Sequence, residues 1–243
     1  MPEKASGLEF GNAAADYERG RFDWPLEALD AIPVPPDAEV LDLAAGTGKL
    51  TRLLARRYAR VVAVEPDDGM RALIEGVESL RGTAEAIPLA DGAVDAVFAA
   101  EAFHWFDGPA ALGEVARVLR PRGFLALLWN TGWDLDPPVP ERAMQLLQEV
   151  YGRMGRPGGP SYQSGEWRNA FESAPFEPLR EHHFRRQLVV EPELVVSLWL
   201  SVSSVAALPD GERAEVGEKL RAAITESRRF GVTTDLYWTR LAE

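Results

Sequence analysis

Two glycines and two acidic residues form the part of this sequence best suited to chemistry. Asp42, Gly46 and Gly48 follow the pattern Asp-x-x-x-Gly-x-Gly, and Glu65 comes 17 residues after Gly48. A residue without a Cβ atom lets the backbone adopt unusual torsion angles and lie close against a ligand. A carboxylate at the position of Glu65 can accept hydrogen bonds from both hydroxyls of a ribose. These residues therefore predict a nucleotide-binding loop.

Two other nucleotide-binding patterns fit the same residues less well. A P-loop requires Gly-x-x-x-x-Gly-Lys-Ser/Thr, but Leu43 occupies its first glycine position and Leu50 its hydroxyl position. The dinucleotide fingerprint Gly-x-Gly-x-x-Gly keeps its first two glycines and has Thr51 in place of the third. The P-loop is therefore excluded, and a nicotinamide-dependent oxidoreductase remains as a weaker alternative.

Strands and helices must alternate around this loop to position it. The apolar run 39–43 predicts a buried strand, and the helical pattern 49–58 directs its first free N–H groups toward the ligand. Further strands are predicted at residues 60–64, 77–82, 93–99, 124–129, 180–190 and 232–240. Further helices are predicted at residues 109–119, 141–151, 191–203 and 211–227, with two short ones within 13–29.

At this point the sequence resembles the class I S-adenosylmethionine (SAM)-dependent methyltransferases. The residues that carry the likeness are the Asp42–Gly48 pattern and the segments 61–65, 82–89, 93–98, 102–107 and 114–123. They look most like the small-molecule branch that includes quinone C-methyltransferases and trans-aconitate methyltransferase. The resemblance covers residues 10–130 well. It implies an α/β, Rossmann-like, doubly wound seven-stranded sheet in the order 3-2-1-4-5-7-6, with the last strand antiparallel and a helical cap insertion.

The resemblance also implies that SAM is the cofactor and S-adenosylhomocysteine the product. Arg21 would then pair with the methionine carboxylate, because a guanidinium can bind both of its oxygens. Thr83 stands where many relatives carry an aspartate for the adenine amino group. The cofactor-binding residues implied are Arg21, Asp42, Ala44, Gly46, Thr47, Gly48, Glu65, Pro66, Met70, Thr83, Ala84, Glu85, Glu101 and Phe103.

Methyl transfer from SAM is an in-line displacement, and holding the acceptor close and aligned supplies much of the rate. A base is needed only when the acceptor arrives protonated, and His104 is the histidine nearest the predicted site. His104 can also be a structural residue whose ring is satisfied by backbone groups. Tyr17 is expected near the methyl group by the resemblance. His104 and Tyr17 are therefore the candidate catalytic residues, and no metal site is expected.

Several tryptophans fall in segments that border the predicted acceptor site. They are Trp24, Trp105, Trp129, Trp133 and Trp167, and together they suggest an aromatic-walled substrate pocket. Core packing is the competing explanation for each of them. The pattern is typical of a pocket for an apolar or planar small molecule.

The composition excludes several classes of function. The formal net charge is −12 over 243 residues, which argues against a nucleic-acid partner. Cysteine is absent, so the chain has no disulfide and no thiolate chemistry. No signal peptide or membrane span is visible in the sequence, and a cytoplasmic protein is expected. The expected partner is a small-molecule acceptor, and the expected assembly is a monomer or a homodimer.

These observations predict one methyltransferase domain over residues 1–243, with a cap or lid insertion at 131–175 after the fifth strand. The predicted activity is transfer of the SAM methyl group to an oxygen, nitrogen or carbon atom of a small-molecule acceptor. The alternative is a SAM-binding protein without methyl transfer, acting as a cyclase or as a ligand-responsive module. Turnover distinguishes the two.

Overall fold

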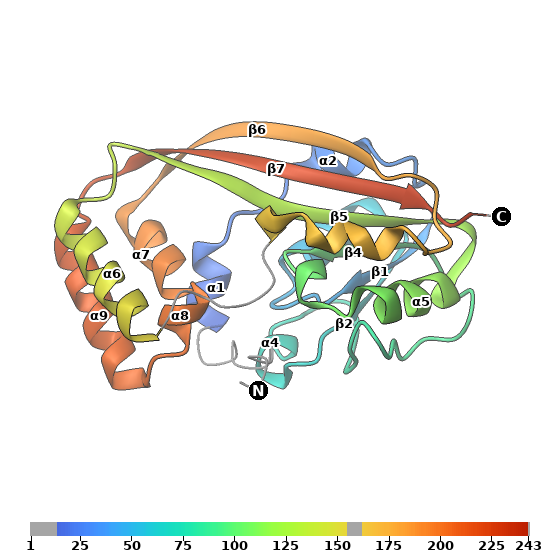
Figure 1. The fold of residues 1–243 in the computed structure, drawn as a ribbon, viewed down its shortest axis with the longest axis horizontal. Coiled ribbons are helices and arrows are strands. Elements are labelled where there is room, and N and C mark those ends of the chain that lie inside the picture. Colours follow the sequence, from blue (N-terminus) through green and yellow to red (C-terminus); the bar gives the residue numbers. More distant parts are fainter. Residues whose placement is uncertain (1–13, 155–161, 243) are drawn as a thin grey trace. The chain divides into compact units, whose positions relative to one another are not determined.

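A computed structural model describes residues 14–154 and 162–242 of the chain (Figure 1). The chain divides into two compact units. The sheet unit comprises residues 23–130, 160–184 and 234–243. The helical unit comprises residues 1–22, 131–159 and 185–233. The prediction of a single domain with a cap at 131–175 stays a prediction.

Seven strands form one sheet in the order β3-β2-β1-β4-β5-β7-β6, which confirms the predicted order. Strands β1 to β5 pair in parallel, with Asp42 of β1 beside Ala63 of β2 and Phe98 of β4. The last strand is antiparallel, as predicted. Gly123, near the start of β5, accepts the N–H of Leu241, just after the end of β7, at 2.8 Å. Thr131, further along β5, bonds Thr233, which lies earlier in β7, so the two strands run in opposite directions. The strands are β1 Glu39–Leu43, β2 Arg60–Val64, β3 Glu78–Leu80, β4 Val94–Ala100, β5 Leu119–Asp136, β6 Arg180–Val190 and β7 Arg228–Arg240.

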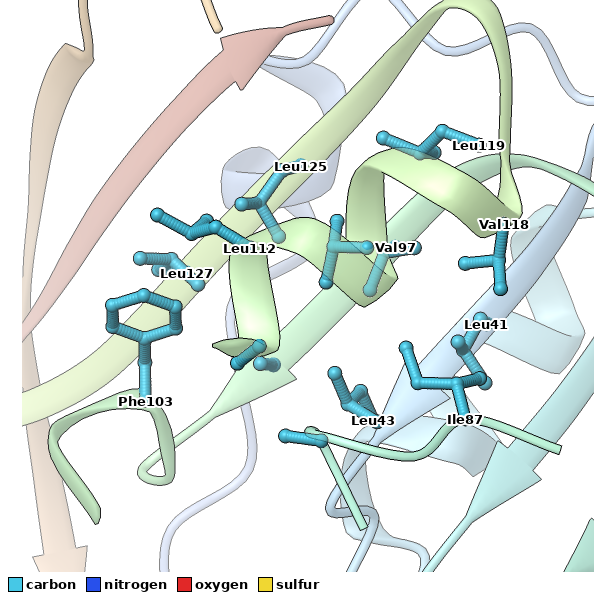
Figure 2. Close-up of a cluster of buried hydrophobic side chains, with 14 of the residues drawn as sticks. Leu41, Leu43, Ile87, Val97, Phe103, Leu112, Val118, Leu119, Leu125 and Leu127 are labelled. Atoms are coloured by element: carbon cyan, nitrogen blue, oxygen red, sulfur yellow. The ribbon is translucent and has the colours of Figure 1, made fainter. Parts of the chain in front are cut away.

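Alternation along the central strands places apolar side chains on both faces of the sheet, as expected for parallel strands covered on two sides. On one face, alternate residues of β1, β4 and β5 pack against α5 (Gly108–Val118). Figure 2 shows this cluster, in which Leu41, Val97 and Leu125 lie near Leu112 and Val118 of the helix. The 3-10 helix η5 (Glu166–Phe171) adds Trp167 to the same cluster.

The opposite face of the sheet is covered by α2 (Leu26–Asp30) and α3 (Lys49–Arg57). Val40, Ala96 and Phe98 point to this side, and Leu29 and Leu54 of the two helices are fully buried against it. Two covered faces make the sheet doubly wound. In such sheets, ligands bind outside the carboxyl ends of the strands.

The helical unit has its own hydrophobic core. Helix α1 (Ala14–Gly20) packs against α7 (Pro192–Leu200), and α7 packs against α9 (Asp210–Ala223). Helix α6 (Glu141–Met154) contacts α9 and the short α8 (Ser203–Ala206). Apolar residues from α6, α7, α9 and the start of β7 form the core of this unit.

Replacing Gly20 with alanine is expected to destabilise the packing of α1 against α7. A Cβ at this position would overlap backbone atoms of Ser197 and Leu198, and a backbone cannot move aside as a flexible side chain can. Overpacking of this kind costs about 1–3 kcal/mol of unfolding free energy. Urea denaturation measures the loss, with Gly152→Ala in α6 as the control, because a Cβ there meets nothing within 4 Å. An equal effect of both substitutions would contradict the packing argument.

Most predicted elements appear within a few residues of their expected bounds, but β5 is a clear exception. The sequence predicts a strand at 124–129, whereas β5 spans Leu119–Asp136 and passes through Gly132 at φ 70°. Thr131 donates its hydroxyl to Thr233 O at 3.3 Å, so β7 holds this extension. A helix is also predicted at 191–203, whereas the observed helix α7 is shorter and ends at Leu200.

Two kinds of feature are absent from residues 14–154 and 162–242. Within these ranges no helix is both long and apolar enough to span a bilayer. The same part of the chain contains no cluster of three or more histidine, aspartate or glutamate side chains able to hold a metal ion. The absence of a metal site, of a membrane partner and of a nucleic-acid partner stays a prediction.

Candidate functional site

The glycine loop lies between β1 and α3 and has the unusual backbone that the sequence predicts. Gly46 has φ 58° and Gly48 φ 83°, and even Ala44 has φ 56°, a left-handed conformation that side-chain-bearing residues seldom adopt. A Cβ added to Gly48 would lie 3.2 Å from Cγ1 of Ile74. A side chain at this position would therefore be strained.

Glu65 follows β2 and faces the glycine loop. Its Oε2 accepts the N–H of Gly46 at 2.8 Å, and its Oε1 accepts the N–H of Asp67 at 2.9 Å. The side chain is only 5% exposed, and this burial raises the pKa of its carboxyl group. Each carboxylate oxygen has a second lone pair, so each can still accept one further hydrogen bond.

Asp42 lies in β1 beneath the loop and is 1% exposed. Its Oδ2 accepts the hydroxyl of Thr51 in α3 at 2.6 Å, which ties the strand to the first turns of the helix. Burial, with a smaller contribution from Glu65, raises the pKa of Asp42 to about 7. The structure thus gives Asp42 a role in shaping the loop, and its contact with the cofactor stays a prediction.

The remaining predicted cofactor residues of the sheet unit lie in the glycine loop or follow β2, β3 and β4. Met70 is buried in α4 (Asp68–Arg71). Its Sδ would lie 3.9 Å from a Cβ atom added to Gly46. Glu85 accepts the N–H of Asp107 at 3.0 Å, and Glu101 accepts the N–H of Asn130 at 2.7 Å. Thr47, Ala84 and Phe103 are buried, Pro66 is half-buried, and Thr83 is exposed.

These residues fit the cofactor that the resemblance implies. The loop 44–48, Glu65 and the turn at Glu101 follow neighbouring parallel strands, so they lie at the same edge of the sheet. The glycine backbone offers space, and Glu65 offers two oxygens with remaining capacity to accept hydroxyl protons. A ribose diol matches this pair of acceptors.

His104 lies in the 3-10 helix η3 (Phe103–Trp105), which follows β4. Its Nδ1 lies 3.0 Å from Nε1 of Trp129, and the indole nitrogen can only donate. Burial lowers the pKa of His104 to about 4, so the ring is neutral at pH 7. A neutral ring with Nδ1 already occupied is a weak base. The catalytic role of His104 stays a prediction.

A cleft of about 340 Å³ opens beside His104 within the sheet unit. Its walls come from residues 103–109 and from the segment 164–170, with Phe103, Phe106 and Trp167 supplying aromatic surface. Glu166 and Asn169 add polar groups, and Glu166 is its single charged lining residue. Small-molecule sites have this combination of size, apolar walls and few polar groups.

The tryptophans predicted to form the pocket differ in their surroundings. Trp24 is buried in the core that α2 and α3 share, so core packing accounts for it. Trp105 is 38% exposed and lies beside the His104 ring at 5.3 Å between centroids. Trp129 is 1% exposed and stacks on Tyr162 at 4.5 Å. The side chain of Trp133 lies outside the described part of the structure.

Tyr17 and Arg21 belong to the helical unit, whereas the glycine loop and the cleft residues above belong to the sheet unit. Tyr17 lies in α1, and the Arg21 guanidinium lies 5.2 Å from the centre of its ring. Arg21 also donates to Ser201 O at 3.4 Å. Their roles at the methyl group and at the methionine carboxylate stay predictions.

Trp167, which the sequence suggests as a pocket residue, lines one wall of the cleft together with Glu166 and Asn169, which the sequence does not indicate. A polar network anchors this wall to β6 and β7. Tyr162 donates its hydroxyl to Asp235 at 2.7 Å, and Arg168 donates to the Tyr237 hydroxyl at 2.8 Å. Such pairing between distant segments leaves no local pattern in a sequence.

Comparison with known proteins agrees with the geometry. A family model described as a methyltransferase domain matches residues 41–127. An uncharacterized methyltransferase of Mycobacterium tuberculosis is 39% identical over 223 residues, which cover 88% of this chain and 84% of that protein. A malonyl-[acyl-carrier protein] O-methyltransferase of Methylococcus capsulatus is 37% identical over 142 residues, about half of each chain (51% and 51%).

A solved structure shows the same fold at low identity. It is described as a type II methyltransferase from Anaeromyxobacter dehalogenans, and it superposes with a TM-score of 0.64 at 22% identity, covering 91% of this chain and 98% of that one. The glycine loop, the sheet order and the similarity to the mycobacterial protein over most of both chains lead to one assignment. The chain belongs to the SAM-dependent methyltransferase family.

Proposed function

We infer that this enzyme transfers the methyl group of SAM to a small-molecule acceptor, at an oxygen, nitrogen or carbon atom. The observation that carries the proposal is the cleft of about 340 Å³, which opens at the turn after β4. A cleft of this volume suits a small molecule, and the strand edge beside it carries the nucleotide loop.

When bound, SAM supplies a methyl group activated by a sulfonium. The residues of the chain then act mainly by position. Glu65 would receive the ribose hydroxyls, while Gly46 and Gly48 would let the backbone lie against the ligand. The aromatic walls of the cleft exclude water and orient the acceptor, which supplies most of the rate in an in-line displacement. The acceptor proton passes to solvent or to an adjacent group.

The test combines binding with turnover. Calorimetry with SAM, S-adenosylhomocysteine and NAD is expected to show saturable binding of the first two and no binding of NAD. The enzyme is then incubated with tritiated SAM and a cell-extract ultrafiltrate free of macromolecules. A parallel incubation contains the protein and nucleic acid retained by the filter. Label in a new small molecule supports the proposal, whereas label found only in the retained protein or nucleic acid contradicts it. Binding of SAM with no transfer to any fraction favours a binding module without turnover.

A further inference from the structure

The contact between Trp129 and His104 determines which nitrogen of the histidine carries the proton. The indole Nε1 of Trp129 is a donor with no acceptor capacity, and it lies 3.0 Å from Nδ1 of His104. Nδ1 must therefore accept, and a neutral imidazole then carries its proton on Nε2. Trp129 is held in place by Tyr162 and Trp167, whose ring centroids lie 4.5 Å and 4.9 Å from its own.

His104 lines the cleft, and Nε2 is the ring nitrogen left to bind a ligand there. Within the described residues no hydrogen bond to Nε2 is present. The walls around it are the rings of Phe103, Phe106 and Trp167. An N–H group set in an aromatic wall is a specific site for an acceptor oxygen, because leaving it without a partner under a bound ligand is costly.

The charge of the cleft limits the kind of oxygen that it can receive. Glu166 is the one charged residue among its lining residues, and no cationic side chain is among them. A carboxylate ligand would therefore meet a like charge, and the Arg168 guanidinium, which stacks on Trp167, is already bonded to the Tyr237 hydroxyl. A neutral carbonyl oxygen faces no such penalty and accepts the Nε2 proton equally well.

We propose that His104 is a hydrogen-bond donor that binds a neutral carbonyl oxygen of a flat, apolar methyl acceptor, and that Trp129 is its positioning residue. The proposal rests on the proposed function, since it assigns the cleft to the acceptor. It replaces the idea of His104 as a proton acceptor, because Nδ1 is occupied and Nε2 already carries a proton. The transferred methyl group is received elsewhere on the acceptor.

The first measurement is the tautomer of His104 by ¹⁵N NMR of the labelled full-length protein, which has three histidines to assign. We expect a protonated Nε2 and an unprotonated Nδ1 in the wild type. In Trp129→Phe, which lacks the indole donor, we expect a mixture of tautomers. A wild-type ring protonated on Nδ1 overturns the proposal, and so does an unchanged tautomer in a folded Trp129→Phe protein.

The second measurement uses three probes of similar shape: acetophenone with a neutral carbonyl, benzoate with a charge, and cumene with no oxygen. We expect the wild type to bind acetophenone about three- to tenfold more tightly than the other two, the range of one neutral hydrogen bond. Glutamine places an amide donor near the position of Nε2, whereas asparagine places it near Nδ1. His104→Gln should therefore keep the preference for acetophenone, and His104→Asn should lose it.

These outcomes separate the present proposal from the proposed function. Equal binding of the three probes by the wild type, or an undiminished preference in His104→Asn, overturns the role of His104. Neither probe binding nor the NMR tautomer depends on SAM. The calorimetric titration with S-adenosylhomocysteine tests the cofactor separately, so its failure would remove the proposed function and leave these results readable.

Discussion

Replacing Asp42 with asparagine is expected to make the protein more stable above pH 7 while changing its stability little near pH 4. Burial raises the pKa of Asp42 from 3.8 to about 7 in the folded protein, so the folded state binds this proton more tightly than the unfolded state. The free energy of unfolding must then fall as pH rises from about 4 to about 7. At 1.36 kcal/mol per pKa unit, the full difference is on the order of 4 kcal/mol.

Asparagine is a suitable replacement because its side-chain oxygen can still accept the hydroxyl of Thr51, which lies 2.6 Å from Oδ2 of Asp42. Urea denaturation of both proteins at several pH values between 4.5 and 8.5 measures the effect. The difference in unfolding free energy should increase through this range and level off above pH 7. The exposed Asp37 provides the control, since Asp37→Asn should leave the curve unchanged. A difference that does not vary with pH would show that Asp42 titrates normally.

Replacing Glu65 with alanine is expected to weaken SAM binding by about 100-fold or more. Hydrogen bonds to a charged group contribute about 1.5–3 kcal/mol each, and a ribose offers two hydroxyls. The substitution also removes the acceptor for the N–H groups of Gly46 and Asp67, so the glycine loop and the turn after β2 each lose one hydrogen bond. Calorimetry with SAM and S-adenosylhomocysteine measures the loss. Glu78→Ala in β3 is the matched control, because this glutamate is exposed and bonds Arg60 at the surface.

A pair of ligands distinguishes loss of the ribose contact from collapse of the loop. Adenosine carries both hydroxyls, and 2′,3′-dideoxyadenosine carries neither. If Glu65 binds the ribose, the wild type prefers adenosine and Glu65→Ala binds the two ligands equally. A preference for adenosine that survives in Glu65→Ala would place the ribose away from Glu65, even if overall affinity had fallen.

The central sheet was predictable because its signals are local. A buried parallel strand is an unbroken apolar run, and strand 60–64 is predicted at its observed bounds for this reason. The extension of β5 beyond Trp129 was not predictable, since Asn130, Thr131 and Gly132 favour a turn when read alone. Pairing with β7, more than 90 residues later in the chain, overrides that preference.

In the candidate site, too, local features were predictable and contacts between distant segments were not. Gly46, Gly48 and Glu65 could be found from their spacing, because the loop and the strand ends that hold them are local features. The state of His104 could not be found in this way. It depends on Trp129, 25 residues away in a neighbouring strand, and on the aromatic rings that hold that indole in place.

The anchoring of the cleft wall has a consequence for how such enzymes diversify. The nucleotide loop is encoded in β1 and β2, whereas one wall of the cleft comes from residues 164–170, attached to β6 and β7 through the hydroxyls of Tyr162 and Tyr237. Under the proposed function, the residues that bind the cofactor and those that select the acceptor therefore lie in different stretches of sequence. These stretches can change independently. Exchanging the short wall segment between relatives, with its tyrosine anchors kept, is a route to new acceptors that leaves the cofactor site intact.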